Sequence, residues 1–130
     1  MSKFHLEAAI AYWHTQTENN AERWSQILTY YNLLLQINYS PITAMNRTYA
    51  LYKNYGAEKA IGEAIKLKLD DNHLYHALLG HLYQDIDYEK AIIAEKEAMK
   101  HASKISPPNE SLLQRVQKRL GQLEAYVKAN

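Results

Sequence analysis

Apolar residues along this chain recur mostly at intervals of three and four, which is the spacing of one face of an α-helix. From Trp24 to Leu35 the apolar positions follow the i, i+3, i+4, i+7 pattern. Val, Ile and Thr never cluster in alternating runs, and glycine and proline are scarce, so no segment favours a β-strand. The pattern predicts an all-α protein of about seven antiparallel helices. These helices are expected at residues 3–15, 21–37, 41–55, 57–66, 73–85, 87–103 and 110 to the end.

Local start and stop signals separate these helices. Ser40 is a favourable N-cap, and Pro41 suits the first helical position, where its missing N–H does no harm. Gly56 is expected to end that helix, and Asn72 to cap the one that follows it at residue 73. The doubled proline within residues 106–109 is the firmest break, because a residue before proline is driven out of the helical conformation.

The chain nearly repeats itself. Residues 51–61 read LYKNYGAEKAI and residues 82–92 read LYQDIDYEKAI, a shift of 31 residues. A period of this size is typical of stacked helical hairpins, which bind partners and seldom carry chemistry of their own. The repeat therefore favours binding over catalysis. We expect one domain over residues 1–130, built from an N-terminal hairpin (1–40), a first repeat (41–71), a second repeat (72–106) and a C-terminal capping helix (107–130).

The second repeat resembles the tetratricopeptide repeat. The positions that fit its pattern are Leu79, Gly80, Tyr83, Ala91 and Ala98. His76 stands where the family has a tryptophan, and Glu95 stands where it has an aromatic residue. The resemblance implies a groove lined by the first helix of each hairpin. The partner-binding residues that it implies are Tyr49, Tyr52, Lys53, His81 and Gln84. The alternative is that these positions are packing contacts to a neighbouring helix, since aromatic residues at helical spacing usually belong to a core.

Most of the chain also resembles the C-terminal tetratricopeptide-like extension of extracytoplasmic-function sigma factors of bacterial RNA polymerase. The segments that carry the resemblance are HLEAAIAYWH (5–14), ILTYYNLLLQINYSPITAMNRTYAL (27–51) and DDNHLYHALLGHLY (70–83). It implies a regulatory module whose partners are the core domains of the sigma factor or RNA polymerase. In that family the promoter-binding and polymerase-binding domains precede this tail, so no DNA binding is expected of the residues present. The chain is then either a part of such a factor or a free-standing relative, an adaptor that binds a peptide or a protein.

Composition narrows the remaining function classes. Fifteen basic residues face fourteen acidic ones, which gives no broad electrostatic footprint for nucleic acid or anionic lipid. The absence of cysteine, of a long apolar run and of an apolar signal segment leads us to expect a cytoplasmic protein with no membrane partner. No Gly-rich phosphate loop and no recognisable nucleophile motif is present. We therefore expect neither an enzyme nor a cofactor, and a monomer or a weak dimer.

The six histidines invite a metal hypothesis. His73 and His76 share one helix face, but His81 lies about 140° further round the helix. A helical zinc site needs three or four converging ligands, and no carboxylate stands at ligand spacing on that face. We therefore expect no metal site, and half-buried or capped histidines instead.

Two further basic features concern structure. Arg47 lies in an otherwise apolar helix, and a buried arginine needs a partner, so we expect an ion pair with Glu63 or with an acidic residue of the second helix. The last helix has apolar positions spaced 3, 4, 3, 4, which favour a cap over a dimerisation seam. These positions are Leu113, Val116, Leu120, Leu123 and Val127. Arg115, Lys118 and Arg119 are expected on the opposite, solvated face.

Overall fold

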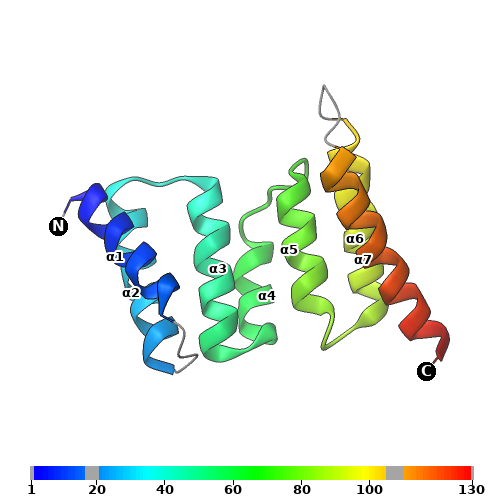
Figure 1. Cartoon of the computed structure of the whole chain (residues 1–130), viewed down its shortest axis with the longest axis horizontal. Helices are drawn as coiled ribbons and strands as arrows, with labels where there is room; N and C mark the ends of the chain where they lie inside the picture. Colours follow the sequence, from blue (N-terminus) through cyan, green and yellow to red (C-terminus); the bar gives the residue numbers. More distant parts are fainter. Residues whose placement is uncertain (1, 17–20, 105–109, 130) are drawn as a thin grey trace. The chain divides into compact units, whose positions relative to one another are not determined.

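The computed structural model of the chain describes residues 2–16, 21–104 and 110–129. Within these residues it contains seven α-helices and no strand, which confirms the all-α prediction (Figure 1). The helices are α1 (Lys3–Thr15), α2 (Ala21–Ile37), α3 (Pro41–Tyr55), α4 (Ala57–Ile65), α5 (His73–Tyr83), α6 (Tyr88–Ala102) and α7 (Glu110–Ala129). The proline-rich break at residues 106–109 lies outside the described residues.

The helix boundaries follow from the caps that the sequence suggests. The Ser40 hydroxyl accepts a hydrogen bond of 3.4 Å from a backbone N–H in the first turn of α3, and Pro41 occupies the first position of that helix. The Asn72 side chain accepts bonds of 2.8 and 3.2 Å from two N–H groups at the start of α5. Gly56 separates α3 from α4 with φ at +96°, in the left-handed region that favours glycine.

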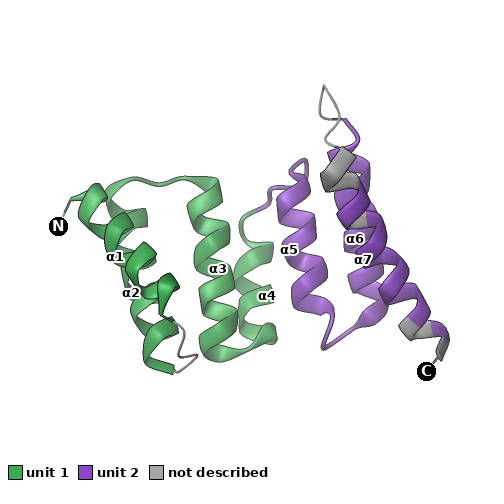
Figure 2. Ribbon diagram, in the orientation of Figure 1, with its two compact units in different colours: residues 1–67 green, residues 68–130 purple. Residues whose placement is uncertain are grey.

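The chain divides into two compact units, residues 1–67 and residues 68–130 (Figure 2). The first unit contains α1 to α4, and each of these helices packs against the next. The second contains α5 to α7, in which α6 packs against both α5 and α7. The division falls four residues before the expected start of the second repeat at residue 72.

The first unit is packed through large side chains. A cluster of buried residues from α1, α2 and α3 forms its core, namely Leu6, Ile10, Trp24, Ile27, Leu28, Tyr31, Leu34, Ala50 and Leu51. The Asn54 amide then joins α3 to α2, since its Nδ2 donates to the Trp24 carbonyl at 2.7 Å and to the Ala50 carbonyl at 3.0 Å. The bond to the Trp24 carbonyl fixes the position of Trp24 along the axis of α2 relative to α3.

The partner of Arg47 differs from the one expected. Its Nε donates to Oδ1 of Asn32 at 2.6 Å, so α3 is joined to α2 by a hydrogen bond to a neutral amide. Glu63 lies on α4 and accepts from Lys66 at 3.4 Å. Arg47 is only half-buried, so its charge stays in contact with water and an acidic partner is not required.

The second unit is packed through small side chains. One face of α6 is a stripe of alanines, each at most 6% exposed, spaced three or four residues apart: Ala91, Ala94, Ala98 and Ala102. Small residues at a helix contact allow the neighbouring axes to approach closely. On α7, Leu123 is 2% exposed, consistent with the expected cap. The side chains of Leu113, Val116 and Val127 lie outside the described ones.

A buried carboxylic acid lies beside this alanine stripe. Glu95 is 4% exposed, and its Oε1 lies 3.7 Å from Nε of Arg119 on α7. Gly80 on α5 makes room for it, since a Cβ there would lie 2.5 Å from Oε1. Burial raises the pKa of Glu95 to about 7, although the Arg119 guanidinium favours the ionised form. Arg119 therefore faces Glu95 on α6 and is only partly exposed, which corrects the fully solvated placement expected from sequence.

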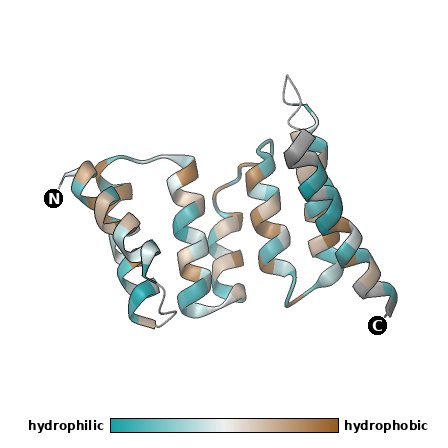
Figure 3. Cartoon of the chain, viewed as in Figure 1, coloured by the Kyte–Doolittle hydropathy of each residue, from teal (hydrophilic) through white to brown (hydrophobic). Residues whose placement is uncertain are grey.

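Hydrophobic and hydrophilic residues are mixed along every helix (Figure 3). Among the described residues, no helix combines the length and the apolar character that crossing a membrane would require.

We expect Gly80→Ala to destabilise the second unit by about 1–3 kcal/mol, because the added methyl group overlaps Glu95 in a packed interior. Gly121 on α7 is the matched control. Nothing lies within 4 Å of a Cβ added there, so Gly121→Ala should stabilise the helix by about 0.5–1 kcal/mol. Urea unfolding followed by circular dichroism measures both, and equal signs for the two variants would contradict this packing.

Glu95 should make stability depend on pH. Its folded pKa of about 7 lies above the 4.5 of the unfolded chain, so the folded state binds the proton more tightly. This contribution is complete below pH 4.5 and is lost as the pH rises through about 7, by at most about 3 kcal/mol. Glu95→Gln stays neutral and should lose that part of the pH dependence in urea unfolding. Glu89 is exposed, so the control variant Glu89→Gln should keep the full pH dependence of stability.

Candidate functional site

Three of the residues implied by resemblance come together on α3 of the first unit. Nζ of Lys53 lies 5.8 Å from the ring centroids of Tyr49, Tyr52 and Trp24 alike, which is within the range of a cation–π interaction. The Tyr49 ring lies between the other two. Its centroid is 5.7 Å from that of Trp24 and 5.9 Å from that of Tyr52. We call these four residues the aromatic surface.

A hollow of about 280 Å³ adjoins the aromatic surface. Its lining comes from α1, α2 and α3 and consists of His14, Trp24, Tyr31, Asn46 and Tyr49. Pockets for small molecules usually measure roughly 300–1,000 Å³. The hollow thus has room for a side chain of a partner rather than for a whole cofactor. A larger hollow of about 580 Å³ lies along residues 68–73, but its whole lining comes from one continuous segment, the loop before α5 and the first residue of that helix.

Arg23 holds the edge of the hollow in place. Its Nε donates to the Trp13 carbonyl at 3.1 Å and its Nη2 to the His14 carbonyl at 3.2 Å, which satisfies two acceptors at the end of α1. Its guanidinium also lies 4.9 Å from the Trp24 ring centroid. Burial, and then the charge of Arg23, lower the pKa of His14. At neutral pH the positive charges beside the hollow are therefore those of Arg23 and Lys53.

His81 and Gln84, the other two residues implied by resemblance, belong to the second unit. They lie together at the end of α5, where the backbone N–H of Gln84 donates to the His81 carbonyl at 3.4 Å. Both side chains are half-buried.

The second unit has its own hollow, of about 240 Å³, between α5 and α6. It is mostly apolar, and its lining consists of His76, Leu79, Tyr83, Lys90, Ile93, Ala94 and Glu97. Nζ of Lys90 lies 5.6 Å from the ring centroid of Tyr83 on one wall. His76 and Glu97 supply polar atoms on the same lining.

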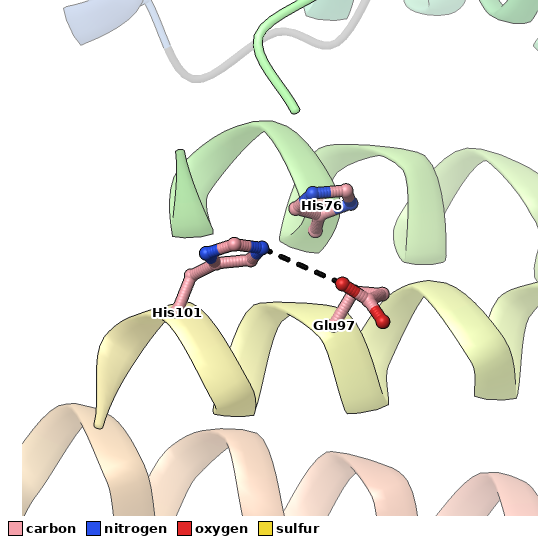
Figure 4. Close-up of side chains that lie close together, drawn as sticks. All are labelled: His76, Glu97 and His101. Atoms are coloured by element: carbon pink, nitrogen blue, oxygen red, sulfur yellow. Dashed lines mark ion pairs between the residues drawn. The ribbon is translucent and has the colours of Figure 1, made fainter. Parts of the chain in front are cut away.

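His76 and Glu97 also belong to a group that we call the histidine cluster, which His101 completes (Figure 4). One ligand atom from each residue lies within 4.8 Å of the others, and all three side chains are half-buried. The two imidazole rings are parallel within 6° at a centroid distance of 5.2 Å. Nε2 of His101 lies 3.4 Å from Oε2 of Glu97. Among the described residues these are the side chains that could hold a metal ion.

Sequence reasoning missed this cluster because it considered the histidines of α5 alone. The signal lies on another helix, where Glu97 and His101 are four residues apart and so share one face. Only the packing of α5 on α6 brings His76 to them. As expected, α5 itself has no carboxylate at ligand spacing from its histidines. The carboxylate near His76 is that of Glu97, which comes from α6.

Comparison of the chain with protein-family models, with curated proteins and with solved structures finds no match. What the chain binds is therefore inferred from the chemistry of its own surfaces.

The pKa of the His14 imidazole provides a test of the hollow in the first unit. In an NMR titration its imidazole should show a pKa below 6.5, because burial and Arg23 both disfavour the charged ring. Arg23→Gln should raise that pKa only part of the way to 6.5, since burial is the larger cause. A value at or above 6.5 in the unmodified protein would show that the hollow is not formed as described.

Proposed function

We propose that the chain is a protein-interaction module and that it binds its partner through the aromatic surface and the adjoining hollow of the first unit. The observation that supports this most directly is the position of Lys53, equidistant at 5.8 Å from three aromatic rings. Tryptophan and tyrosine side chains are enriched among the residues that dominate binding energy at protein interfaces.

The chemistry of this region suggests what the partner presents. The hollow accepts an apolar side chain, since Trp24, Tyr31 and Tyr49 form most of its lining. Arg23 and Lys53 stand beside it and favour a carboxylate next to that apolar residue. The partner segment therefore combines an apolar anchor with a neighbouring Asp or Glu.

The resemblance to sigma-factor extensions supports a specific partner, namely the promoter-binding and polymerase-binding domains of such a factor, in the bacterial cytoplasm. Docking of the helical module on those domains would shift the factor between active and inactive populations. A shift of this kind requires that the module bind one of the two states more tightly.

A free-standing adaptor is the second candidate, favoured by the hollow itself, which suits a peptide unrelated to transcription equally well. The two candidates differ in the size of the native protein. An antibody raised against the chain should detect a band well above 15.1 kDa in source cells if the chain is the tail of a larger factor. A band at 15.1 kDa would favour the adaptor.

The binding surface is tested with two substitutions. Lys53→Glu and Tyr52→Ala should each weaken binding to the purified core domains of the sigma factor by at least tenfold in isothermal titration calorimetry, because each removes part of the aromatic surface. Lys96→Glu is the control, since Lys96 is also exposed but lies on α6 of the second unit.

Each outcome has a separate meaning. Equal loss in Lys96→Glu would indicate a general effect of charge and would contradict the assigned surface. Binding that none of the three changes affects would place the contact elsewhere on the chain. Absence of binding by the unmodified protein would remove the sigma factor as partner, and acidic peptides with an apolar anchor would then be tested against the same variants.

A further inference from the structure

We propose that the histidine cluster is a binding site for a divalent metal ion of the zinc class. This inference is independent of the proposed function, since it concerns the second unit. It starts from the convergence of two imidazoles and one carboxylate on the α5–α6 hairpin (Figure 4). His76 comes from α5, whereas Glu97 and His101 come from successive turns of α6.

The distances are close to those of a coordinated ion. Zinc bonds of about 2.0–2.2 Å in a tetrahedral site place neighbouring ligand atoms about 3.4 Å apart. Oε2 of Glu97 and Nε2 of His101 are already at 3.4 Å. All three ligand atoms lie within 4.8 Å of one another, so the remaining closure is at most on the order of 1.4 Å. Rotation of the two imidazole side chains would provide this closure.

A backbone carbonyl prepares His76 for this role. Its Nε2 lies 2.6 Å from the carbonyl oxygen of Asp70, and since a carbonyl can only accept, Nε2 carries the hydrogen. Nδ1 then keeps the lone pair that a metal requires. Metal-binding histidines usually donate their second ring nitrogen to a carbonyl or a carboxylate, which fixes the tautomer and the ring orientation. Asp70 thus acts as the outer partner of the site.

The helices hold the ligands at a fixed spacing. Glu97 and His101 are four residues apart on α6, so their side chains lie one above the other on the same face. Ala94 and Ala98 beside them are at most 6% exposed and bring α5 within reach. Because the ligand positions are set by helix packing rather than by a loop, little entropy is lost when an ion binds.

The donor set selects the kind of ion. Calcium and magnesium take oxygen ligands, whereas two imidazole nitrogens and one carboxylate suit zinc and its neighbours in the first transition row. Three protein ligands leave one position for water or for a donor atom of a partner. His76 and Glu97 also line the 240 Å³ hollow, so both ligands are reachable from solvent. An ion there would join α5 to α6 and stabilise the folded second unit.

The test uses the full chain without a polyhistidine tag. Titration with CoCl₂ should give one bound ion per chain, with the strong visible absorption of four-coordinate Co²⁺, and ZnCl₂ should displace it. His76→Gln, Glu97→Gln and His101→Gln should each weaken binding by at least tenfold. His73→Gln is the matched control, because His73 is a half-buried histidine of the same helix α5 but lies outside the cluster.

Two results would overturn the site. One is a spectrum that stays that of six-coordinate aqueous Co²⁺, which would leave Glu97 and His101 as a simple ion pair. The other is binding that His73→Gln reduces as much as the cluster variants do. An independent readout needs no variant: ZnCl₂ should shift the NMR signals of the His76 and His101 imidazoles and leave those of His5 unchanged. MgCl₂ at the same concentration should shift none of them.

Discussion

The alanine stripe of α6 is the constraint on which the second unit depends. Ala91, Ala94, Ala98 and Ala102 are nearly inaccessible to solvent, and α6 packs against both of the other helices of that unit. Since these side chains are short, the residues that border the stripe are pressed against the neighbouring helices whatever their chemistry. On one border Glu95 is enclosed beside Gly80 and Arg119. On the other border, Glu97 and His101 meet His76. The tight packing of α6 thus produces both the buried Glu95 beside Arg119 and the histidine cluster.

The first unit follows the opposite principle, and its candidate site arises from that difference. Its core contains Trp24 and Tyr31, whose rings are too large to be covered completely by the flanking helices. Their edges remain available at a hollow, where His14 and Tyr49 extend the aromatic lining. Large rings that are fixed by the core lose little freedom on binding, which suits them to recognise a partner.

The sequence allowed the helices and their ends to be predicted, because those depend on neighbours in the chain. Ser40, Gly56 and Asn72 act within one helical turn, and their roles can be inferred from residue type alone. The grouping of Tyr49, Tyr52 and Lys53 could be predicted for the same reason, since positions three or four apart on a helix are neighbours. The partners of Arg47 and Arg119 could not be predicted from the sequence. Each depends on the register between two helices, and a rotation of one residue, about 100°, selects a different partner.

The histidine cluster illustrates the same limit and also a way around it. Glu97 and His101 have helical ligand spacing, so half of the site is visible in one helix, whereas His76 is 21 residues before Glu97 and joins only through packing. The 31-residue repeat supplies the missing register in principle, because a hairpin of known geometry determines which face of its first helix meets its second. What the repeat does not supply is the size of the residues at the contact. Alanines at positions 94 and 98 let the imidazoles reach each other, and leucines there would hold the same three residues too far apart to share an ion. The proposed metal site therefore depends on the alanines of α6 as much as on the ligands.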